Sequence, residues 1–283
     1  MKGLTEAQIR SYKENGFLVV EDLIPPSAFD PLISEFNAVI DEKARAYHRQ
    51  GKLGTMFEDE PFQRRLDRVY RALDEASAQD IWRAVHGKNM KTAGMFAVMT
   101  HPAILDVVAS MIGPEVLAHP QFNARAKLPH QEATVVPWHQ DLGYLEQDAE
   151  ETFMVNFWIP LVDATVENGC MEVIPGSHGH GLIPHEKIAG YWGVPEDRLP
   201  SKEVVSCPLR VGGVLMIQHK TIHRSIPNVS DHIRWSLDLR YSDPAKPTGR
   251  DVPGFIARSQ AHPERVAQSH RDWLKLFEEK PAA

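Results

Sequence analysis

The chain has 283 residues, of which 42% are hydrophobic and 24% charged, with a formal net charge of −7. This balance is typical of a globular protein with a core, and the negative charge argues against a nucleic-acid partner or an anionic membrane surface. Two cysteines imply no disulfide framework. The sequence has no signal-peptide core and no apolar run near the ~20 residues of a membrane span. We therefore expect a cytoplasmic protein.

The first ~50 residues favour helices around one short strand. Thr5 and Gln8 have the spacing of a capping box, and Gly16 can end the helix that they start. The β-branched run at 17–24 predicts a strand, and Ser27 can cap a second helix. The apolar positions of that second helix follow one amphipathic face: Phe29, Leu32, Ile33, Phe36, Val39 and Ile40.

The predicted secondary structure changes from helices to short strands at about residue 116. Before it, residues 52–90 begin as a loop and end in a helix, and 101–114 predicts another helix. After it, short apolar or alternating runs recur between turn residues, which favours a sandwich or jelly roll over βαβ units. The Gly-, Pro- and His-rich stretch 176–203 is long enough to be a functional loop or lid. We expect one domain, with these approximate parts: helical 1–115, β core 116–245, C-terminal tail 246–283.

The stretch "WHQDLGY", residues 138–144, contains a candidate metal site. Residues two apart in a strand point to the same face, so His139 and Asp141 can direct a nitrogen and an oxygen at one point. Two histidines and one carboxylate on one face of a metal leave positions open for substrate and O2, as in non-haem iron oxygenases. The two residues alone fit equally well on the solvated face of a strand.

A third ligand must come from elsewhere in the chain. Three candidates lie in one segment: His219, His223 and His232. His223 follows the apolar run "GGVLMI" and precedes a Pro-Asn turn, and Arg234 opens another alternating strand eleven residues later. In a hairpin these two positions would face one cavity. A buried arginine suits a dicarboxylate cosubstrate; the alternative is a surface ion pair with Asp231 or Asp238.

Three motifs in this order resemble the phytanoyl-CoA dioxygenase family of iron(II)- and 2-oxoglutarate-dependent oxygenases. They are "HQD" at 139–141, "NGCMEVIPGSH" at 168–178 and "HRSIPNVSDHIR" at 223–234. The opening "LTEAQIRSYKENGFLVVEDLI" is similar to that of the family too, so the resemblance covers about residues 4–242. It implies a mainly β fold with N-terminal helices and a double-stranded β-helix (jelly-roll, cupin-like) core. It also implies Fe(II), 2-oxoglutarate as cosubstrate, and O2.

The resemblance also implies roles for individual residues. The catalytic metal ligands would be His139, Asp141 and His223. Arg234 would hold the distal carboxylate of 2-oxoglutarate, with these residues beside it: Ser225 as a further contact, Trp158 as a wall of the pocket, and Lys127 as a lysine that can also reach 2-oxoglutarate. The alternatives are a core tryptophan and a solvated lysine. Because related halogenases have a small residue in place of the carboxylate, Asp141 argues against halogenation.

The implied activity is hydroxylation, or another oxidation, of an unactivated C–H bond in a small-molecule metabolite, with release of succinate and CO2. By position relative to the ligands, we expect substrate contacts from Phe96, Tyr144, Tyr191 and Trp192. We expect a monomer or homodimer. A rival metal cluster would use His178, His180 and His185. Other classes remain open: a non-catalytic metal-binding jelly-roll sensor or binding protein, or a zinc-dependent hydrolase or isomerase.

Overall fold

The structure, a computed structural model, describes residues 3–278 and contains two antiparallel sheets flanked by helices. The larger sheet has the strand order β1 (Phe17–Val20), β9 (Val214–Gln218), β4 (Val155–Pro160), β11 (Arg234–Ser242), β2 (Val116–Ala118), β12 (Phe255–Arg258), and β3 (Asn123–Lys127) also pairs with β11. The smaller sheet has the order β10 (His223–Ser225), β5 (Met171–Val173), β8 (Val205–Cys207). A separate hairpin joins β6 (Glu186–Ile188) to β7 (Tyr191–Gly193).

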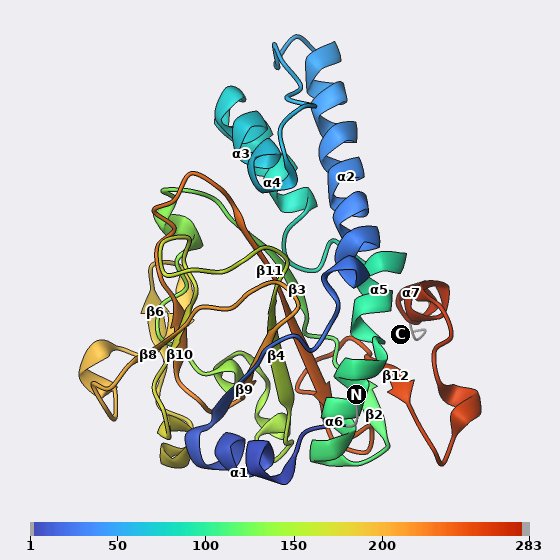
Figure 1. Ribbon diagram of the computed structural model, residues 1–283, viewed down its shortest axis with the longest axis vertical. Coiled ribbons are helices and arrows are strands. Elements are labelled where there is room, and N and C mark those ends of the chain that lie inside the picture. Colours follow the sequence, from blue (N-terminus) through green and yellow to red (C-terminus); the bar gives the residue numbers. More distant parts are fainter. Residues whose placement is uncertain (1–2, 279–283) are drawn as a thin grey trace.

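Helices cover the face of the larger sheet that points away from the smaller one. Figure 1 shows α2, α5 and α6 on one side of the larger sheet and β8 and β10 on the other. The helices are α1 (Glu6–Asn15), α2 (Asp30–Arg49), α3 (Phe62–Ala72), α4 (Glu75–Ala84), α5 (Ala93–Met99), α6 (Pro102–Ile112) and α7 (His270–Glu278). Within residues 3–278 no single helix is long and apolar enough to cross a membrane, although the bent pair α5–α6 passes by length and composition.

Strand β11 separates the hydrophobic core from the interior of the β structure. Its apolar residues contact the helices: Trp235, Leu237, Leu239 and Tyr241. The Trp235 ring lies 4.6 Å from that of Phe62 and 5.0 Å from that of Phe36. Burial of each such ring contributes roughly 1.5–3 kcal/mol. Because side chains alternate along a strand, the polar residues point to the opposite face: Arg234, Ser236, Asp238, Arg240 and Ser242.

The N-terminal helices agree in part with the sequence patterns. The capping box of Thr5 and Gln8 is present, and the strand predicted after it is β1. The predicted cap at Ser27 is wrong, because Pro26–Phe29 form a short 3₁₀ helix and α2 starts only at Asp30. The predicted apolar face of α2 is buried at Phe29, Leu32, Phe36 and Ile40, and partly buried at Ile33 and Val39.

The described part of the expected C-terminal tail belongs to the fold. Strand β12 pairs with β2, and α7 buries Trp273 against Phe122 and Phe255. The expected loop 176–203 likewise contains the β6–β7 hairpin. In both segments the strands are only three or four residues long, too short for an alternating pattern to be visible in the sequence.

Candidate metal centre

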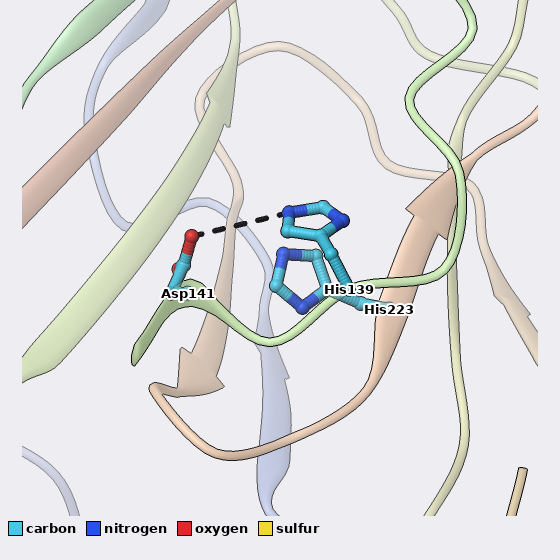
Figure 2. A group of neighbouring side chains, drawn as sticks. All are labelled: His139, Asp141 and His223. Atoms are coloured by element: carbon cyan, nitrogen blue, oxygen red, sulfur yellow. Dashed lines mark ion pairs between the residues drawn. The ribbon is translucent and has the colours of Figure 1, made fainter. Parts of the chain in front are cut away.

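Three buried side chains converge between the two sheets. One ligand atom from each of His139, Asp141 and His223 lies within 4.8 Å of the other two. The imidazole centroids are 4.1 Å apart, and Asp141 Oδ1 lies 4.0 Å from His139 Nε2. Figure 2 shows the two rings side by side with the carboxylate facing them. Within the described chain this is the one group of three such residues with metal-binding spacing.

The backbone positions the two histidines through a direct pairing. The N–H of His139 donates to the carbonyl of His223, and the N–H of His223 donates back, both at 3.0 Å. Asp141 does not continue a strand, because it starts a short 3₁₀ helix, Asp141–Tyr144. The prediction that a regular strand directs His139 and Asp141 to one face is therefore wrong in its reason, although the two side chains do converge.

Both imidazoles have the tautomer that a metal requires. His139 Nδ1 lies 2.9 Å from the carbonyl of Pro137, and His223 Nδ1 lies 2.9 Å from that of Thr221. A carbonyl can only accept, so each Nδ1 carries the proton and each Nε2 keeps a free lone pair. Burial and the neighbouring His223 hold the pKa of His139 well below its usual range. Neutral imidazoles with one carboxylate fit a divalent iron ion.

The carboxylate of Asp141 is fixed by two buried side chains that the sequence patterns did not reveal. Asn156 Nδ2 donates to Oδ2 at 2.6 Å, and Arg240 Nη2 donates to Oδ1. Burial alone would raise the pKa of Asp141, but Arg240 and the two imidazoles lower it well below its usual range. The carboxylate is therefore ionised and ready to bind a cation.

A cavity adjoins His139, Asp141 and His223. Arg234 lies in its wall and is 2% exposed. Its Nε donates to the carbonyl of Gly169 at 3.1 Å and its Nη1 to Ser236 Oγ at 2.5 Å. No carboxylate in the described chain forms an ion pair with Arg234, and its Nη2 has no acceptor there. A buried guanidinium with a free donor predicts an anion at this position.

Gly169 leaves room for the Lys127 side chain and the Ile226 carbonyl at the wall of the cavity. Its φ of +90° is in the left-handed region, and an added Cβ would lie 2.7 Å from Lys127 Cε and 2.6 Å from the Ile226 carbonyl. On the other side, the Arg234 guanidinium lies 5.1 Å from the centre of the Trp158 ring. Trp158 lines the cavity, and it also packs in the apolar cluster behind it.

Lys127 and Ser225 meet beside Arg234. Lys127 is opposite Arg234 in the β3–β11 pairing, and its Nζ donates to Ser225 Oγ at 3.0 Å and to the Thr134 carbonyl at 2.9 Å. Burial, with Arg234 and Arg125 nearby, lowers the pKa of Lys127 to about 6. The lysine is buried at the cavity, so the alternative of a solvated surface lysine is wrong.

His223 and Arg234 share the cavity without forming a hairpin. Strand β10 pairs with β5 in the smaller sheet, whereas β11 pairs with β3 and β4 in the larger one. The predicted hairpin is therefore wrong, and the two residues face each other from different sheets. The alternative ion pairs for Arg234 are absent among the described residues, because Asp231 binds Arg64 and Asp238 binds Arg125.

The other histidines singled out in the sequence lie outside the ligand set. His219 is buried with neither ring nitrogen hydrogen-bonded to a described residue, and His232 contacts Asp231 and Asn168. The rival cluster is not assembled: His185 Nε2 accepts from the Gln140 backbone, His178 contacts the Lys13 carbonyl, and His180 is exposed.

The four residues expected at the substrate have different positions. Tyr191 lines the cavity and donates to the Ala133 carbonyl at 2.8 Å. Tyr144 packs edge-on at 5.6 Å from the His139 ring and donates to the Trp192 carbonyl, while the Trp192 side chain is 44% exposed. Phe96 packs in the core at 5.2 Å from Phe255, away from the cavity lining. Its position gives the expected substrate contact no support, because α5 covers the outer side of the sheet.

Two further cavity residues were missed by sequence reasoning, Arg125 and His86. Arg125 lies two positions before Lys127 on β3 and so points to the same face. That alternation is visible in "NARAK", and the alternation in "RWSLDLRYS" would also have placed Arg240 on the same strand face as Arg234. His86 follows α4 in an irregular segment, where no local sequence pattern predicts the direction of the side chain.

Two sequence comparisons show which family this chain resembles. The profile of the phytanoyl-CoA dioxygenase (PhyH) family matches residues 12–236. Phytanoyl-CoA dioxygenase domain-containing protein 1 of Mus musculus is 25% identical over 275 residues, which covers 87% of this chain and 92% of the mouse protein.

Solved structures show the same fold. The apo form of ThoJ, a non-heme monooxygenase, superposes with a TM-score of 0.66 at 23% identity, covering 95% of this chain and 92% of ThoJ. The epimerase SnoN, in complex with Fe3+, alpha ketoglutarate and nogalamycin RO, has a TM-score of 0.56 at 20% identity, with 87% of each chain covered. With four fifths of its length matched by the profile, the chain belongs to the phytanoyl-CoA dioxygenase family, the non-haem iron dioxygenases that use 2-oxoglutarate.

Proposed function

We propose that this protein oxidises an unactivated C–H bond of a small-molecule metabolite, by hydroxylation or a related outcome, within a double-stranded β-helix formed by the two facing sheets. One observation carries the proposal: the ligand group of His139, Asp141 and His223 opens on the same cavity as Arg234, a buried arginine without an anionic partner among the described residues. SnoN, of similar fold, binds Fe3+ and alpha ketoglutarate.

The proposed roles follow from these contacts. His139 and His223 present neutral Nε2 atoms and Asp141 an ionised oxygen, so the three would hold Fe(II). Bound iron with 2-oxoglutarate supplies the oxidation, in which O2 is reduced and 2-oxoglutarate is split into succinate and CO2. Arg234 would orient the distal carboxylate of 2-oxoglutarate, and the ring of Trp158 would exclude water from that end of the cavity.

Neighbouring groups would complete the cosubstrate site. Ser225 Oγ accepts from Lys127 Nζ and from the Val136 N–H, which leaves its own hydroxyl proton free to donate to a carboxylate. Asp141 would supply a carboxylate to the metal, which favours hydroxylation-type chemistry over halogenation.

The test is succinate formation from 2-oxoglutarate with Fe(II) and ascorbate in air. We expect the wild type to release succinate, slowly without substrate and faster with it, and His139→Ala to fall to the level of metal-free protein. The matched control is His180→Ala, because His180 is exposed and makes no contact with the cavity. Succinate release that survives His139→Ala would overturn the proposal.

The same assay separates the other classes. A zinc-dependent hydrolase or isomerase would act without O2 and 2-oxoglutarate, and a metal-binding sensor would bind the metal without forming succinate under any screened condition. Arg234 argues against both classes, because neither requires a buried arginine in the cavity that the candidate ligands adjoin.

A further inference from the structure

Arg125 extends from β3 into the cavity beside the metal ligands. It lies opposite Ser236 on β11, and its Nε donates to Asp238 Oδ2 at 2.6 Å. The side chain is 29% exposed, and Arg125 is one of the residues that line the cavity. The Asp238 contact restrains the guanidinium through Nε and leaves Nη1 and Nη2 without a hydrogen bond to a described residue.

Both terminal nitrogens of Arg125 lack an acceptor within residues 3–278, since Nε makes the only hydrogen bond of this guanidinium. Nη1 and Nη2 form the fork that binds a carboxylate through two parallel hydrogen bonds. Arg234 differs, because two of its three nitrogens are committed to Gly169 and Ser236. The cavity therefore offers a second, more open guanidinium.

His86 supplies another donor at the same wall. Its ring stacks on Trp82 at 3.9 Å, and the Trp82 indole is itself fixed by donating to the Ala126 carbonyl at 3.0 Å. His86 Nδ1 accepts from the Ala126 N–H at 3.4 Å, which places the ring proton on Nε2. Burial, with Arg125 and Arg234 nearby, lowers the pKa of His86 to about 3, so the ring is neutral.

The charges of the site leave room for one more anion. Arg125 is balanced by Asp238 and Arg240 by Asp141. A divalent metal together with Arg234 then brings three positive charges, of which the dianion 2-oxoglutarate neutralises two. Lys127 adds little charge at neutral pH. A substrate with a single negative charge would make the loaded site neutral, and burying an unbalanced charge is costly.

We propose that Arg125 and His86 form a carboxylate-binding subsite for the substrate, separate from the cosubstrate anchor at Arg234. The substrate class is a small molecule with one carboxylate, held by the Arg125 fork and the His86 N–H so that a carbon further along the molecule faces the metal ligands. This proposal rests on the proposed function for its substrate, but the subsite can be measured without turnover.

The probe is acetate, titrated calorimetrically without O2 into protein loaded with Fe(II) and saturating 2-oxoglutarate. We expect one saturable acetate site per chain that leaves the affinity for 2-oxoglutarate unchanged, as read from the visible absorption of the iron complex. Acetate that binds without saturation, or that competes with 2-oxoglutarate, would overturn the subsite. A failure of 2-oxoglutarate to bind would instead overturn the proposed function.

The variants remove the donors without leaving a lone charge. The pair Arg125→Gln with Asp238→Asn deletes both charges of the ion pair, and we expect acetate affinity to fall at least about 10-fold. His86→Phe keeps the stacking on Trp82 and removes the N–H, with an expected fall of about 3- to 10-fold.

Acetate binding to the metal-free protein tests the subsite independently of the proposed function. There we expect two acetate sites per chain in the wild type and one in Arg234→Gln, because Arg125 still binds acetate when Arg234 is replaced. Loss of all acetate binding in Arg234→Gln would show that Arg125 belongs to the cosubstrate site, and would overturn the proposal.

Discussion

Arg240 donates a hydrogen bond to the same oxygen of Asp141, Oδ1, that faces the ring of His139. The arginine is 4% exposed, and its Nε and Nη1 have no partner among the described atoms. In the metal-free protein, Arg240 thus supplies the positive charge that balances the carboxylate. A bound metal would share that task, so the charge of Arg240 and the charge of the metal are coupled through Asp141.

Arg240→Met tests this coupling. Removing one partner of a buried ion pair costs roughly 3–5 kcal/mol, and we expect that loss in the free energy of unfolding of the metal-free variant. Because a metal replaces the missing charge, Mn(II) should stabilise the variant more than it stabilises the wild type. Urea unfolding with and without Mn(II) measures both effects. Arg210→Met is the control, since Arg210 is exposed; equal stabilisation by Mn(II) in Arg240→Met and the wild type would contradict the coupling.

The grouping of the three candidate ligands was predictable because ligand chemistry is carried by residue type and order. His139, Asp141 and His223 were identified without knowledge of the backbone, and the structure brings their ligand atoms together. The reason offered for the convergence of His139 and Asp141, a regular strand, was wrong, because Asp141 starts a 3₁₀ helix. A backbone bridge between His139 and His223 brings the two histidines together. Such a bridge joins residues 84 apart, and no local pattern encodes it.

The surrounding residues were predictable only in part. Arg240 and Arg125 are separated by even numbers of positions from Arg234 and Lys127 on the same strands, so alternation contained the information. Phe96 was misplaced because an apolar helix does not reveal which side of a sheet it covers. His86 depends on how an irregular segment after α4 packs against β3, which is a tertiary contact.

Asn156→Leu tests how the second oxygen of Asp141 is held. The Asn156 amide donates to Oδ2 at 2.6 Å, and leucine has a similar size without the donor. Outer contacts of this kind orient a metal ligand, and their loss lowers metal affinity by about 10- to 100-fold. Competition of the variant with a chelator for Fe(II) or Mn(II) measures the change. Unaltered affinity would mean that Arg240 alone orients the carboxylate.

Arg234→Gln tests the cosubstrate anchor. A hydrogen bond between charged groups contributes about 1.5–3 kcal/mol, so the dissociation constant for 2-oxoglutarate should rise by about 10- to 100-fold. Metal affinity should stay unchanged, because Arg234 makes no contact with the three ligands. Arg210→Gln serves as the exposed control. A parallel fall in metal affinity would instead indicate that the replacement disturbs the whole cavity.

Lys127 predicts a pH dependence of stability. Its pKa is about 6 in the folded protein and about 10.4 in an unfolded chain. Between these values the unfolded chain binds a proton that the folded chain does not, so the free energy of unfolding rises with pH by about 1.4 kcal/mol per unit from this group. Below pH 6 both states are protonated and this contribution to the slope vanishes.

Lys127→Met removes this contribution while keeping the length of the side chain. The lost hydrogen bonds to Thr134 and Ser225 shift the stability by a constant, whereas the loss of the titrating amine changes the slope. We therefore expect the stability of the metal-free wild type, relative to the variant, to increase steadily from pH 6 to pH 9 in urea unfolding. Lys187→Met, at an exposed position in β6, should run parallel to the wild type. If Lys127→Met also ran parallel, the lysine would be charged in the folded protein, and its ammonium would be an additional binding group for the carboxylates of 2-oxoglutarate.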